Sequence, residues 1–575
     1  MVATTESAVA KATARSELEI LSGGQMVCKA LVREGVEVVF GYPGGQVIPL
    51  YHVLPEFPLR HVLVRHEQAA AHAADGYARA TGRVGVCIAT SGPGATNLVT
   101  GLATAYLDST PMVAITGQVP TSLLGRNSFQ EVDTCGITRP VTKANFLVAD
   151  VREVATVMRE AFRLAQSGRP GPVLVDLPRD VQVARGPFYH VPAGDMRGCR
   201  SNLVGNPRQV QQAAALLRTA KRPLLLAGHG AQLAGAHEEL RRLAETANVP
   251  VVSSLMGLGS FPGSHPLYFG LVGMHGRAYA NRALCECDLV VALGTRLGDR
   301  TTAKASTFAR QAKLVHVDVD PAEIGKNVPA DVPIVGDVRG VLRALLGEDL
   351  RGEGEERRAW LAQLAAWRKE AQPAPRQRRG RVSPQDVIAA LHRHTAGQAT
   401  IVTDVGQHQL WAAQHYTYDR PRSYISSGGL GTMGFGLPAA MGAKIACPEA
   451  DVWAVCGDGG LQMNIQELAT LAQEGTAVRI ALLNNGYLGM VRQWQELFYE
   501  KRYSSTPLLG PDFVRVAEAY GVPARRVERD EEVAPALAWA SAVDGPALLE
   551  FVVEREENVF PMVPPGGSLH EVMEG

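Results

Sequence analysis

The chain has 575 residues, of which 46% are hydrophobic and 20% are charged. Its 57 Lys and Arg residues balance 57 Asp and Glu residues, so it lacks the long-range field that collects nucleic acid or anionic membrane. No apolar run reaches the roughly 20 residues of a membrane span. The polar stretch 1–19 lacks the apolar core of a signal peptide. We therefore expect small-molecule ligands, with no nucleic-acid or membrane partner.

Eight cysteines are spread along the chain, most of them inside apolar segments such as VGVCIAT and VWAVCGD. No CxxC pair occurs, so a zinc centre is not expected. Scattered cysteines in apolar surroundings are typical of buried thiols in a reducing compartment. This pattern predicts a cytoplasmic protein.

Short apolar runs alternate with longer helix-like segments from one end of the chain to the other. Each run is rich in Val, Ile and Leu, and is followed by Gly or Asp, as buried parallel strands are. Such alternation predicts an α/β fold with three doubly wound parallel-sheet domains. In chain order the runs are VGVCIAT (84–90), PMVAIT (111–116), GPVLVDL (171–177), RPLLLAG (222–228), DLVVALG (288–294), KLVHVDV (313–319), TIVTDVG (400–406), VWAVCGDG (452–459) and VRIALLNN (478–485).

Two shifts in composition indicate domain boundaries. The stretch 186–207 is rich in Gly and Pro without helical spacing, and 347–381 joins a charged helical stretch to a Pro/Arg-rich connector. We interpret the second as a solvated linker rather than a nucleic-acid-binding segment. The expected division is a first domain at 18–188, a central domain at 205–346, a linker at 347–380, a third domain at 381–560 and a tail at 561–575. The first and third domains have similar strand and helix rhythms.

Two consecutive apolar runs end in residues that bear oxygen ligands. Gly457-Asp458-Gly459 closes VWAVC, Asn484-Asn485 closes VRIALL, and 24 residues separate the motifs. Parallel strands bind ligands where their carboxyl ends meet at one sheet edge. Magnesium is often held there by one or two side chains plus phosphates, and glycines let a diphosphate approach backbone N–H groups. Either motif alone is an ordinary turn, but the pair predicts a magnesium and diphosphate site.

A single carboxylate stands out far upstream. Glu67, in RHEQAAAHAADGYARATG, follows the apolar run HVLV at the expected start of a helix. A carboxylate at a helix start is favoured by the macrodipole in any case. The residues alone therefore leave open whether Glu67 has a catalytic or only a local structural role.

The GDG and NN motifs resemble the diphosphate motif of thiamine-diphosphate enzymes. Among these, the chain is most similar to the acetohydroxyacid synthase (acetolactate synthase) family, from about Ser22 to Met573. The order and completeness of its motifs carry the resemblance. They are GYPGG, SGPGATNLVTG, ITGQVP, SFQE, ITRPVTK, GRPGPVLVDLPRD, GMHG, IGKN, WAAQ, GGLGTMGFGLPAA, NIQELAT and LGMVRQW.

The resemblance implies thiamine diphosphate and Mg²⁺ as cofactors. It assigns the pyrimidine to the first domain and the diphosphate and metal to the third. In the family, a glutamate at the place of Glu67 hydrogen-bonds N1′ of the aminopyrimidine and so activates the cofactor. The implied metal ligands are Asp458, Asn485 and the main-chain carbonyl of Tyr487. The implied cofactor contacts are Gly406, Gln407, His408, Gly431, Met433, Gly459 and Gly460.

The same resemblance assigns residues to the reacting centre and the substrate pocket. Gly45, Phe129 and Gln130 would lie at the reacting centre, and Lys143 near the substrate entrance. Met490 and Trp494, four apart on an expected helix, would line the acceptor pocket, and Arg300 would meet a carboxylate with its bidentate fork. Without the family match, Met and Trp at this spacing are simply core residues.

The central domain resembles the flavin-binding domain of these enzymes, which makes FAD a third implied cofactor with a structural role. The Asp of VHVDVD suits a ribose contact, whereas glycines after strands are also ordinary strand ends. Gly298 departs from the acidic residue that is often present there. The implied contacts are Arg169, Gly228, Gly230, Leu255, Met256, Gly273, Met274, His275, Gly294, Arg296, Asp318, Asp337 and Val338.

The resemblance implies an enzyme that decarboxylates pyruvate and condenses the two-carbon unit with pyruvate or 2-ketobutyrate. The products, 2-acetolactate and 2-aceto-2-hydroxybutyrate, lead to branched-chain amino acids. Alternatives are a flavin-dependent pyruvate oxidase or a catabolic acetolactate synthase on the same scaffold, and a non-catalytic relative. A homodimer or homotetramer is expected, because Glu67 and Asp458 lie in different domains and the family builds its site between subunits. A small regulatory subunit is a further expectation.

Overall fold

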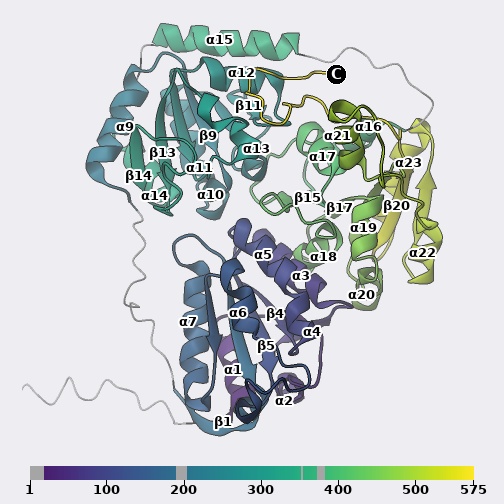
Figure 1. Cartoon of the computed structure of the whole chain (residues 1–575). Helices are drawn as coiled ribbons and strands as arrows, with labels where there is room; N and C mark the ends of the chain where they lie inside the picture. Colours follow the sequence, from purple (N-terminus) through teal and green to yellow (C-terminus); the bar gives the residue numbers. More distant parts are fainter. Residues whose placement is uncertain (1–18, 190–203, 351, 353, 372–381) are drawn as a thin grey trace, which may run out of the picture. The chain divides into compact units, whose positions relative to one another are not determined.

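The computed structural model describes residues 19–189, 204–350, 352, 354–371 and 382–575 (Figure 1). Its described residues form two compact units, one from within 19–74 and 84–189 and the other from within 75–83 and 204–575. Three six-stranded parallel sheets confirm the predicted α/β class, and all nine predicted strands are present. No helix in the described ranges is long and apolar enough to cross a membrane.

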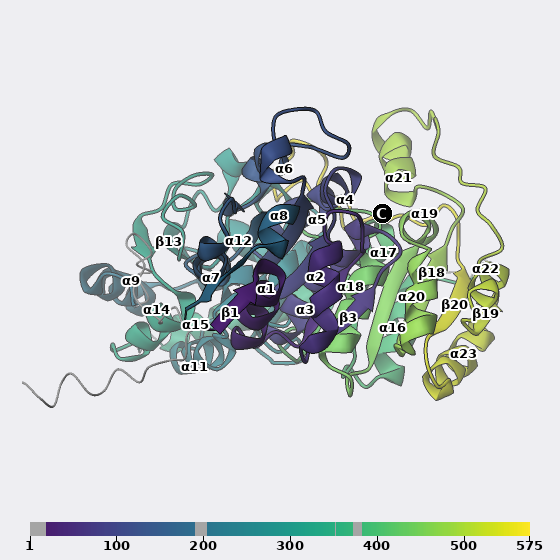
Figure 2. The same ribbon diagram turned by 90° about the horizontal axis from the view of Figure 1, so that it is seen from below.

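The first unit is built on a sheet with the strand order β3-β2-β4-β5-β7-β6. Helices α1 (Gly23–Arg33) and α7 (Val154–Gln166) pack against each other on one face of this sheet (Figure 2). A capping box between Ser22 and Gln25 starts α1. A short antiparallel pair, β1 (Glu19–Ser22) and β8 (Arg185–Phe188), joins the two ends of the unit. The six strands are β2 (Val38–Gly41), β3 (Arg60–Leu63), β4 (Gly85–Ala89), β5 (Met112–Gln118), β6 (Ala144–Leu147) and β7 (Pro172–Pro178).

The third sheet, which belongs to the second unit, has the order β16-β15-β17-β18-β20-β19. Counted within its own sheet, this order is the same as that of the first, so the similar rhythms of the two domains reflect one topology. Helices α16 (Pro384–His394), α17 (Gln407–His415) and α23 (Asp530–Ala542) supply residues to one core cluster with its strands. The strands are β15 (Thr400–Thr403), β16 (Tyr424–Ser426), β17 (Val452–Gly457), β18 (Val478–Asn484), β19 (Ala524–Val527) and β20 (Ala547–Val552).

The central sheet differs from the other two, with the order β11-β10-β9-β12-β13-β14. Counted from its own first strand, this is the order 3-2-1-4-5-6 of dinucleotide-binding folds. The strand order reverses between the first and fourth strands, β9 and β12. Helices α9 (Pro207–Thr219), α11 (His237–Ala247) and α14 (Val338–Leu346) cover one face. The strands are β9 (Pro223–Ala227), β10 (Val251–Ser253), β11 (Tyr268–Leu271), β12 (Leu289–Leu293), β13 (Lys313–Asp318) and β14 (Val332–Val335).

The predicted solvated linker has to be corrected for the helix that it contains, α15 (Gly354–Glu370). Trp360, Leu364 and Trp367 of this helix are buried in the core cluster on the second face of the central sheet, together with residues of α12 (Ala278–Glu286). Arg357 is 2% exposed, and its guanidinium donates to the carbonyls of residues at the ends of α9 and α11. The apolar stripe of Trp360, Leu364 and Trp367 was not predicted because α15 is rich in charged residues. The Pro/Arg-rich connector 372–381 lies outside the described residues.

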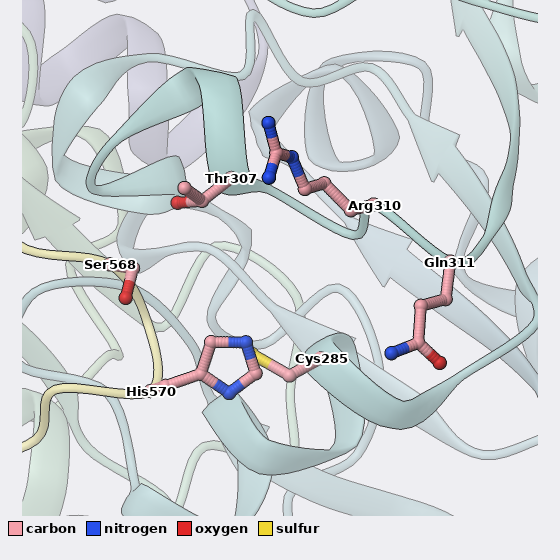
Figure 3. A pocket seen from close by; sticks show the side chains of 6 residues that line it. All are labelled: Cys285, Thr307, Arg310, Gln311, Ser568 and His570. Atoms are coloured by element: carbon pink, nitrogen blue, oxygen red, sulfur yellow. The ribbon is translucent and has the colours of Figure 1, made fainter.

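The tail expected at 561–575 also packs on the central sheet. Val563 and Leu569 belong to the same core cluster as Trp360. The Val563 N–H donates to the Met274 carbonyl at 2.8 Å, and the Lys304 N–H donates to the Gly567 carbonyl at 3.0 Å. A pocket of about 220 Å³ lies between this tail, α12 and the segment 307–311 (Figure 3); it is lined by Cys285, Thr307, Arg310, Gln311, Ser568 and His570.

Candidate functional site

The carboxyl edge of the third sheet collects the predicted metal ligands. Asp458 follows β17 as the first residue of α19 (Asp458–Met463), and Asn485 follows β18. Asp458 is 2% exposed, and its Oδ2 has no hydrogen-bond partner among the described residues. Burial raises the pKa of this carboxyl to about 7. A buried, unpartnered carboxylate oxygen is costly unless a cation offsets it, so this edge fits Mg²⁺.

Hydrogen bonds hold the Asn485 side chain in one orientation. Its Nδ2 donates to Gln407 Oε1 at 3.1 Å, and its Oδ1 accepts from the Tyr487 N–H at 3.1 Å. Gln407 is itself fixed, because its Nε2 donates to Gln493 Oε1 at 2.9 Å and to the Glu557 carbonyl at 3.0 Å. In the described residues, no group of three or more His, Cys, Asp or Glu side chains is arranged to hold a metal. A cation at Asp458 would therefore draw on amide and carbonyl oxygens and on phosphate, as Mg²⁺ does.

Glycines let neighbouring side chains approach the backbone closely at this edge, where a Cβ atom would collide with them. A Cβ on Gly457 would lie 2.8 Å from His408 Nδ1, and one on Gly460 would lie 2.3 Å from Asp404 Oδ1. His408 is 6% exposed and its Nε2 has no hydrogen-bond partner in the described structure. Burial lowers the pKa of His408 to about 3, so its ring is neutral. Neutral polar groups and backbone N–H groups beside a helix start are the groups that hold a diphosphate.

Asp404, which the sequence reasoning missed, organises the same edge. It follows β15, is fully buried, and accepts hydrogen bonds from the N–H groups of Gly434 at 3.0 Å and Gly436 at 2.9 Å. This carboxylate fixes the turn that carries the predicted contacts Gly431 and Met433. The Met433 methyl lies 3.4 Å from where a Gly459 Cβ would be, so the turn lies against the GDG motif. An aspartate that closes an apolar run and precedes Gly406 was the available signal.

In the first unit, Glu67 begins α3 (Glu67–Thr81) and is half-buried. Its Oε2 accepts a hydrogen bond from Asn97 Nδ2 at 2.9 Å. Its Oε1 lies 3.2 Å from where a Cβ on Gly94 would be, in the SGPG turn that follows β4. Asn97 ends α4 (Pro93–Asn97), so this short helix orients the carboxylate.

Gln130 lies beside the same SGPG turn. A Cβ on Gly92 would lie 2.9 Å from the Cβ of Gln130. Phe129 is 85% exposed, and Gly45, which follows β2, has no atom within 4 Å of an added Cβ. Both therefore leave open space next to them. Lys143 is placed differently, because its Nζ donates to the carbonyls of Leu164 and Ser167 at 2.5 and 2.6 Å, at the end of α7.

The predicted acceptor-pocket residues lie on α21 (Gly489–Phe498), which begins four residues after Asn485. Met490 packs against the core cluster of the third sheet, and the ring of Trp494 contacts that of Phe498 at a centroid distance of 5.7 Å. Arg300 lies on α13 (Asp299–Thr302) of the central domain. Its side chain is 64% exposed and is 3.2 Å from Asp299.

The predicted flavin contacts line the carboxyl edge of the central sheet. Gly230 and Gly294 come so close that a Cβ on Gly230 would lie 2.6 Å from the Gly294 Cα. These two turns follow β9 and β12, the strands that flank the reversal of strand order. The other residues at this edge are Gly228, Leu255, Met256, Gly273, Met274, His275, Arg296, Asp318, Asp337 and Val338. Arg169 belongs to the first unit, where its Nε donates to Ser109 Oγ at 2.8 Å.

The GMHG turn of this edge is held from two sides. The Met274 N–H donates to the Arg300 carbonyl at 2.9 Å, and the Met274 carbonyl accepts from Val563 of the tail. His275 Nδ1 lies 3.3 Å from the Pro561 carbonyl. Burial lowers the pKa of His275 to about 4, so the ring is neutral.

Comparisons with known proteins agree with this geometry. Three family profiles match, namely the thiamine pyrophosphate enzyme N-terminal TPP binding domain over residues 21–137, the central domain over 210–345, and the C-terminal TPP binding domain over 404–551. Thiamine pyrophosphate is the same compound as thiamine diphosphate.

Curated relatives are similar over nearly the whole chain. A probable acetolactate synthase large subunit of Methanocaldococcus jannaschii is 48% identical over 564 residues, which is 96% of this chain and 95% of the relative. An acetolactate synthase large subunit of Corynebacterium glutamicum is 49% identical over 96% of this chain and 90% of its own. An acetolactate synthase of Arthrospira platensis is 48% identical over 96% and 98%. The chain therefore belongs to the acetolactate synthase large-subunit family of thiamine pyrophosphate enzymes.

Proposed function

We propose that this protein is a thiamine-diphosphate-dependent acetolactate synthase of branched-chain amino acid biosynthesis. It decarboxylates pyruvate and joins the two-carbon unit to pyruvate, giving 2-acetolactate, or to 2-ketobutyrate, giving 2-aceto-2-hydroxybutyrate. The observation that carries the proposal is the buried Asp458 carboxylate at a glycine-lined sheet edge, whose Oδ2 has no hydrogen-bond partner among the described residues. The relatives of this chain at about 50% identity are acetolactate synthases. The proposal goes beyond the family in the substrates and in the residues that hold them.

The residues at the third sheet edge fit the diphosphate end of the cofactor. Asp458, Asn485 and the Tyr487 carbonyl would hold Mg²⁺, and the turn Gly406-Gln407-His408 with Gly459 and Gly460 would hold the diphosphate. Gly431 and Met433 would support the pyrimidine side. When bound, the cofactor supplies the nucleophilic carbon and the electron sink for decarboxylating a 2-ketoacid.

Glu67 would act on the cofactor through one proton. Asn97 binds only Oε2 of the Glu67 carboxylate, which leaves Oε1 to share a proton with N1′ of the pyrimidine. A donor on one oxygen fixes the orientation of the other, as a proton-transferring carboxylate requires. Gly45, Phe129 and Gln130 would bound the reacting centre, with the Gln130 amide donating to developing negative charge.

The acceptor would lie against α21. Met490 and Trp494 offer one apolar surface beside the Asn485 turn, and the larger side chain of 2-ketobutyrate would bury more area on it than pyruvate does. Arg300 would meet the ketoacid carboxylate, since its guanidinium is only partly engaged with Asp299. Lys143 stays a proposed entrance residue, which requires its ammonium to leave the two carbonyls at the end of α7.

FAD is the proposed third cofactor, bound along the central sheet edge from Gly228 and Gly230 to Asp337 and Val338. The strand order and the close glycine turns support it. The flavin would be structural, because joining two ketoacids with loss of carbon dioxide transfers no net electrons. Protein purified without added flavin should then be yellow, and acid-released flavin should approach one per chain.

We further propose a homodimer as the smallest active assembly. Larger assemblies would be a homotetramer and a complex with a separate small regulatory subunit. Glu67 and Asp458 belong to different compact units, so a site that needs both can take them from two subunits. Coexpression of Glu67→Gln and Asp458→Asn chains tests this. If sites are shared, a mixed dimer has one site with both native residues and regains activity. If each site lies within one chain, both sites carry a substitution and the dimer stays inactive. The proposed cytoplasmic location is supported by the seven free thiols of the described residues.

The deciding experiment is a product assay on purified protein with pyruvate, in which thiamine diphosphate, Mg²⁺ and FAD are added singly and together. Acetolactate formed without oxygen uptake, and more 2-aceto-2-hydroxybutyrate when 2-ketobutyrate competes, supports the proposal. Acetate with oxygen uptake would instead identify a flavin-dependent pyruvate oxidase. Full activity in colourless protein would identify a catabolic, flavin-free synthase.

A further inference from the structure

The loop that connects β5 to α6 (Thr134–Thr138), residues 119–133, carries Phe129 and Gln130. Its backbone is costly to form, because Asn127 and Gln130 have left-handed φ angles of 53° and 61°. Such conformations persist only where the surrounding contacts determine them. The contacts that hold this loop therefore bear on the position of the two residues proposed at the reacting centre.

The two ends of the loop are tied together at its neck by Gln118, the last residue of β5. Gln118 Nε2 donates to the Val132 carbonyl at 2.8 Å and to Asp176 Oδ2 at 3.0 Å, and Gln118 Oε1 accepts from the Val119 N–H at 2.9 Å. Both N–H groups and the oxygen of the amide thus have partners. Since the side chain is 2% exposed, it has one satisfied orientation and no competing water.

Asp176, near the end of β7, holds the Gln118 side chain at this neck. It is 1% exposed, and its Oδ1 accepts from Thr116 Oγ1 at 2.7 Å while its Oδ2 accepts from Gln118. Burial, with a smaller contribution from nearby Asp133, raises its pKa to about 7. A buried carboxylate lowers stability unless hydrogen bonds compensate for the lost water. Both hydrogen bonds of Asp176 come from β5, the strand that leads into the loop.

Other contacts stiffen the loop internally or tie it to α8 (Arg179–Val183), without closing its neck. The Glu131 carboxylate accepts from the Ser128 N–H at 2.8 Å and also from Gly125, and Asp180 accepts from Thr121. These contacts shape separate parts of the loop. Gln118, by contrast, joins the first residue of the loop to its far end through one side chain.

We propose that Asp176 and Gln118 are positioning residues for the reaction, which hold the neck of loop 119–133 and so keep Phe129 and Gln130 at the reacting centre. The catalytic consequence rests on the proposed function. The structural part, that these two side chains set the position of the loop, does not depend on it.

The variants distinguish the loss of these hydrogen bonds from a change of side chain that keeps them. Asp176→Ala removes the acceptor of Gln118 and Thr116, and Gln118→Leu removes the link to Val132. Asp176→Asn keeps both bonds, because its oxygen can accept from Gln118 while its NH₂ donates to the rotatable hydroxyl of Thr116. Glu34→Ala is the control, since it breaks the Glu34–Arg159 ion pair of 2.6 Å elsewhere in the same unit.

Two readouts follow the loop and the reaction separately. Arg126 is the only trypsin site in the loop, so the rate of cleavage there reports the opening of the loop without any activity. Local opening should speed this cleavage about 10-fold or more in Asp176→Ala and Gln118→Leu, but less than about twofold in Asp176→Asn and Glu34→Ala. In the first two, kcat should fall about 10-fold or more while thiamine-diphosphate affinity stays within about threefold, as expected for misplaced reacting groups.

Wild-type cleavage rates at Arg126 in both neck variants would overturn the proposal, as would a loss of kcat that only follows the fall in Tm, as in Glu34→Ala. Failure of Asp176→Asn to restore the wild-type cleavage rate and at least half of kcat would also overturn it. If the wild-type enzyme forms no acetolactate, the proposed function fails, but the cleavage comparison still decides whether Asp176 and Gln118 hold the loop.

Discussion

Gln407 Oε1 accepts a hydrogen bond from Asn485 Nδ2 at 3.1 Å and so joins the turns that follow β15 and β18. The amide nitrogen of Asn485 is engaged, and its oxygen accepts one hydrogen bond from the Tyr487 N–H. The second lone pair of that oxygen is therefore left to face a cation. The fold therefore orients the Asn485 side chain before a metal binds.

Gln407→Leu should therefore weaken Mg²⁺ binding about 10-fold or more, because Asn485 loses the partner that fixes its amide. Isothermal titration of Mg²⁺ into protein saturated with thiamine diphosphate measures this. Gln409→Leu on the same helix is the matched control, since Gln409 Nε2 donates to Ser426 Oγ at 2.7 Å and not to Asn485. Equal Mg²⁺ affinity in the Gln407→Leu and wild-type proteins would exclude this role.

Asp458→Asn should change stability and metal binding in opposite directions. It removes a buried carboxylate whose Oδ2 has no partner in the described part of the chain, so the cofactor-free protein should gain about 1 kcal/mol or more, a rise in Tm of about 2–4 °C. Mg²⁺-dependent binding of thiamine diphosphate should be lost. Calorimetry without and with both ligands gives both results, and Glu449→Gln, an exposed carboxylate just before β17, is the control. A lower Tm of the cofactor-free variant would contradict this account of Asp458.

Glu67→Gln should lower turnover about 100-fold or more, because the amide cannot exchange a proton with N1′ of the pyrimidine. The affinity for thiamine diphosphate should stay within a few-fold, since Gln keeps the size and hydrogen bonds of the side chain. Steady-state assays and cofactor titration by fluorescence quenching separate the two effects. Glu153→Gln, an exposed carboxylate before α7, should change neither. Near-normal turnover in Glu67→Gln would show that another group activates the cofactor.

The Asp176 carboxyl should make stability depend on pH. Its folded-state pKa of about 7 lies above its ordinary value of 3.8, so the folded state binds the proton more tightly than the unfolded state. The resulting stabilisation is full below pH 3.8 and is lost as pH rises to about 7. Urea unfolding at pH 5.0 and pH 7.5 should show wild type losing more stability over this interval than Asp176→Asn does. Equal losses in the two proteins would mean that the carboxyl titrates normally.

If FAD binds as proposed, Gly230→Ala should release it, because its Cβ would lie 2.6 Å from the Gly294 Cα and would push the two turns apart. Flavin content by absorbance after gel filtration should fall about 10-fold or more, since the fit of backbone to pyrophosphate depends on this turn. Gly235→Ala is the control. It is strained at φ 60° but meets no atom within 4 Å, so it should lower Tm and keep its flavin. Flavin loss in both variants would indicate general destabilisation instead.

The central strands could be predicted from sequence because they are buried on both faces. Runs such as VVALG and VWAVC are continuously apolar for this reason, and each became a strand in the interior of a sheet. Edge strands such as β6 (Ala144–Leu147) and β19 (Ala524–Val527) contain Asn145 or Arg526 and give no such signal. The spatial order of the strands was not predictable either, because crossovers of similar length produce both observed orders.

The metal and diphosphate residues could be predicted because their motifs stand directly at the ends of apolar runs, which are visible in the sequence. Asp404 was not predicted because its partners are backbone N–H groups, which leave no trace in the identity of the partner residue. Gln118 was not predicted because it binds the Val132 carbonyl and Asp176, a side chain 58 positions away in the chain. The buried side of α15 escaped because the apolar stripe of Trp360, Leu364 and Trp367 is diluted by charged neighbours on the same helix.

The place of the tail in the central core has a consequence for synthesis on the ribosome. Val563 and Leu569 complete a core cluster on one face of the central sheet, whose last strand ends at Val335. A growing chain that has made every strand of that sheet must still add more than two hundred residues before this face is closed. At about 5–20 residues per second, that interval lasts roughly ten seconds or more. During that time the nascent central domain presents an incomplete apolar face, and it is then that chaperones have a surface to bind.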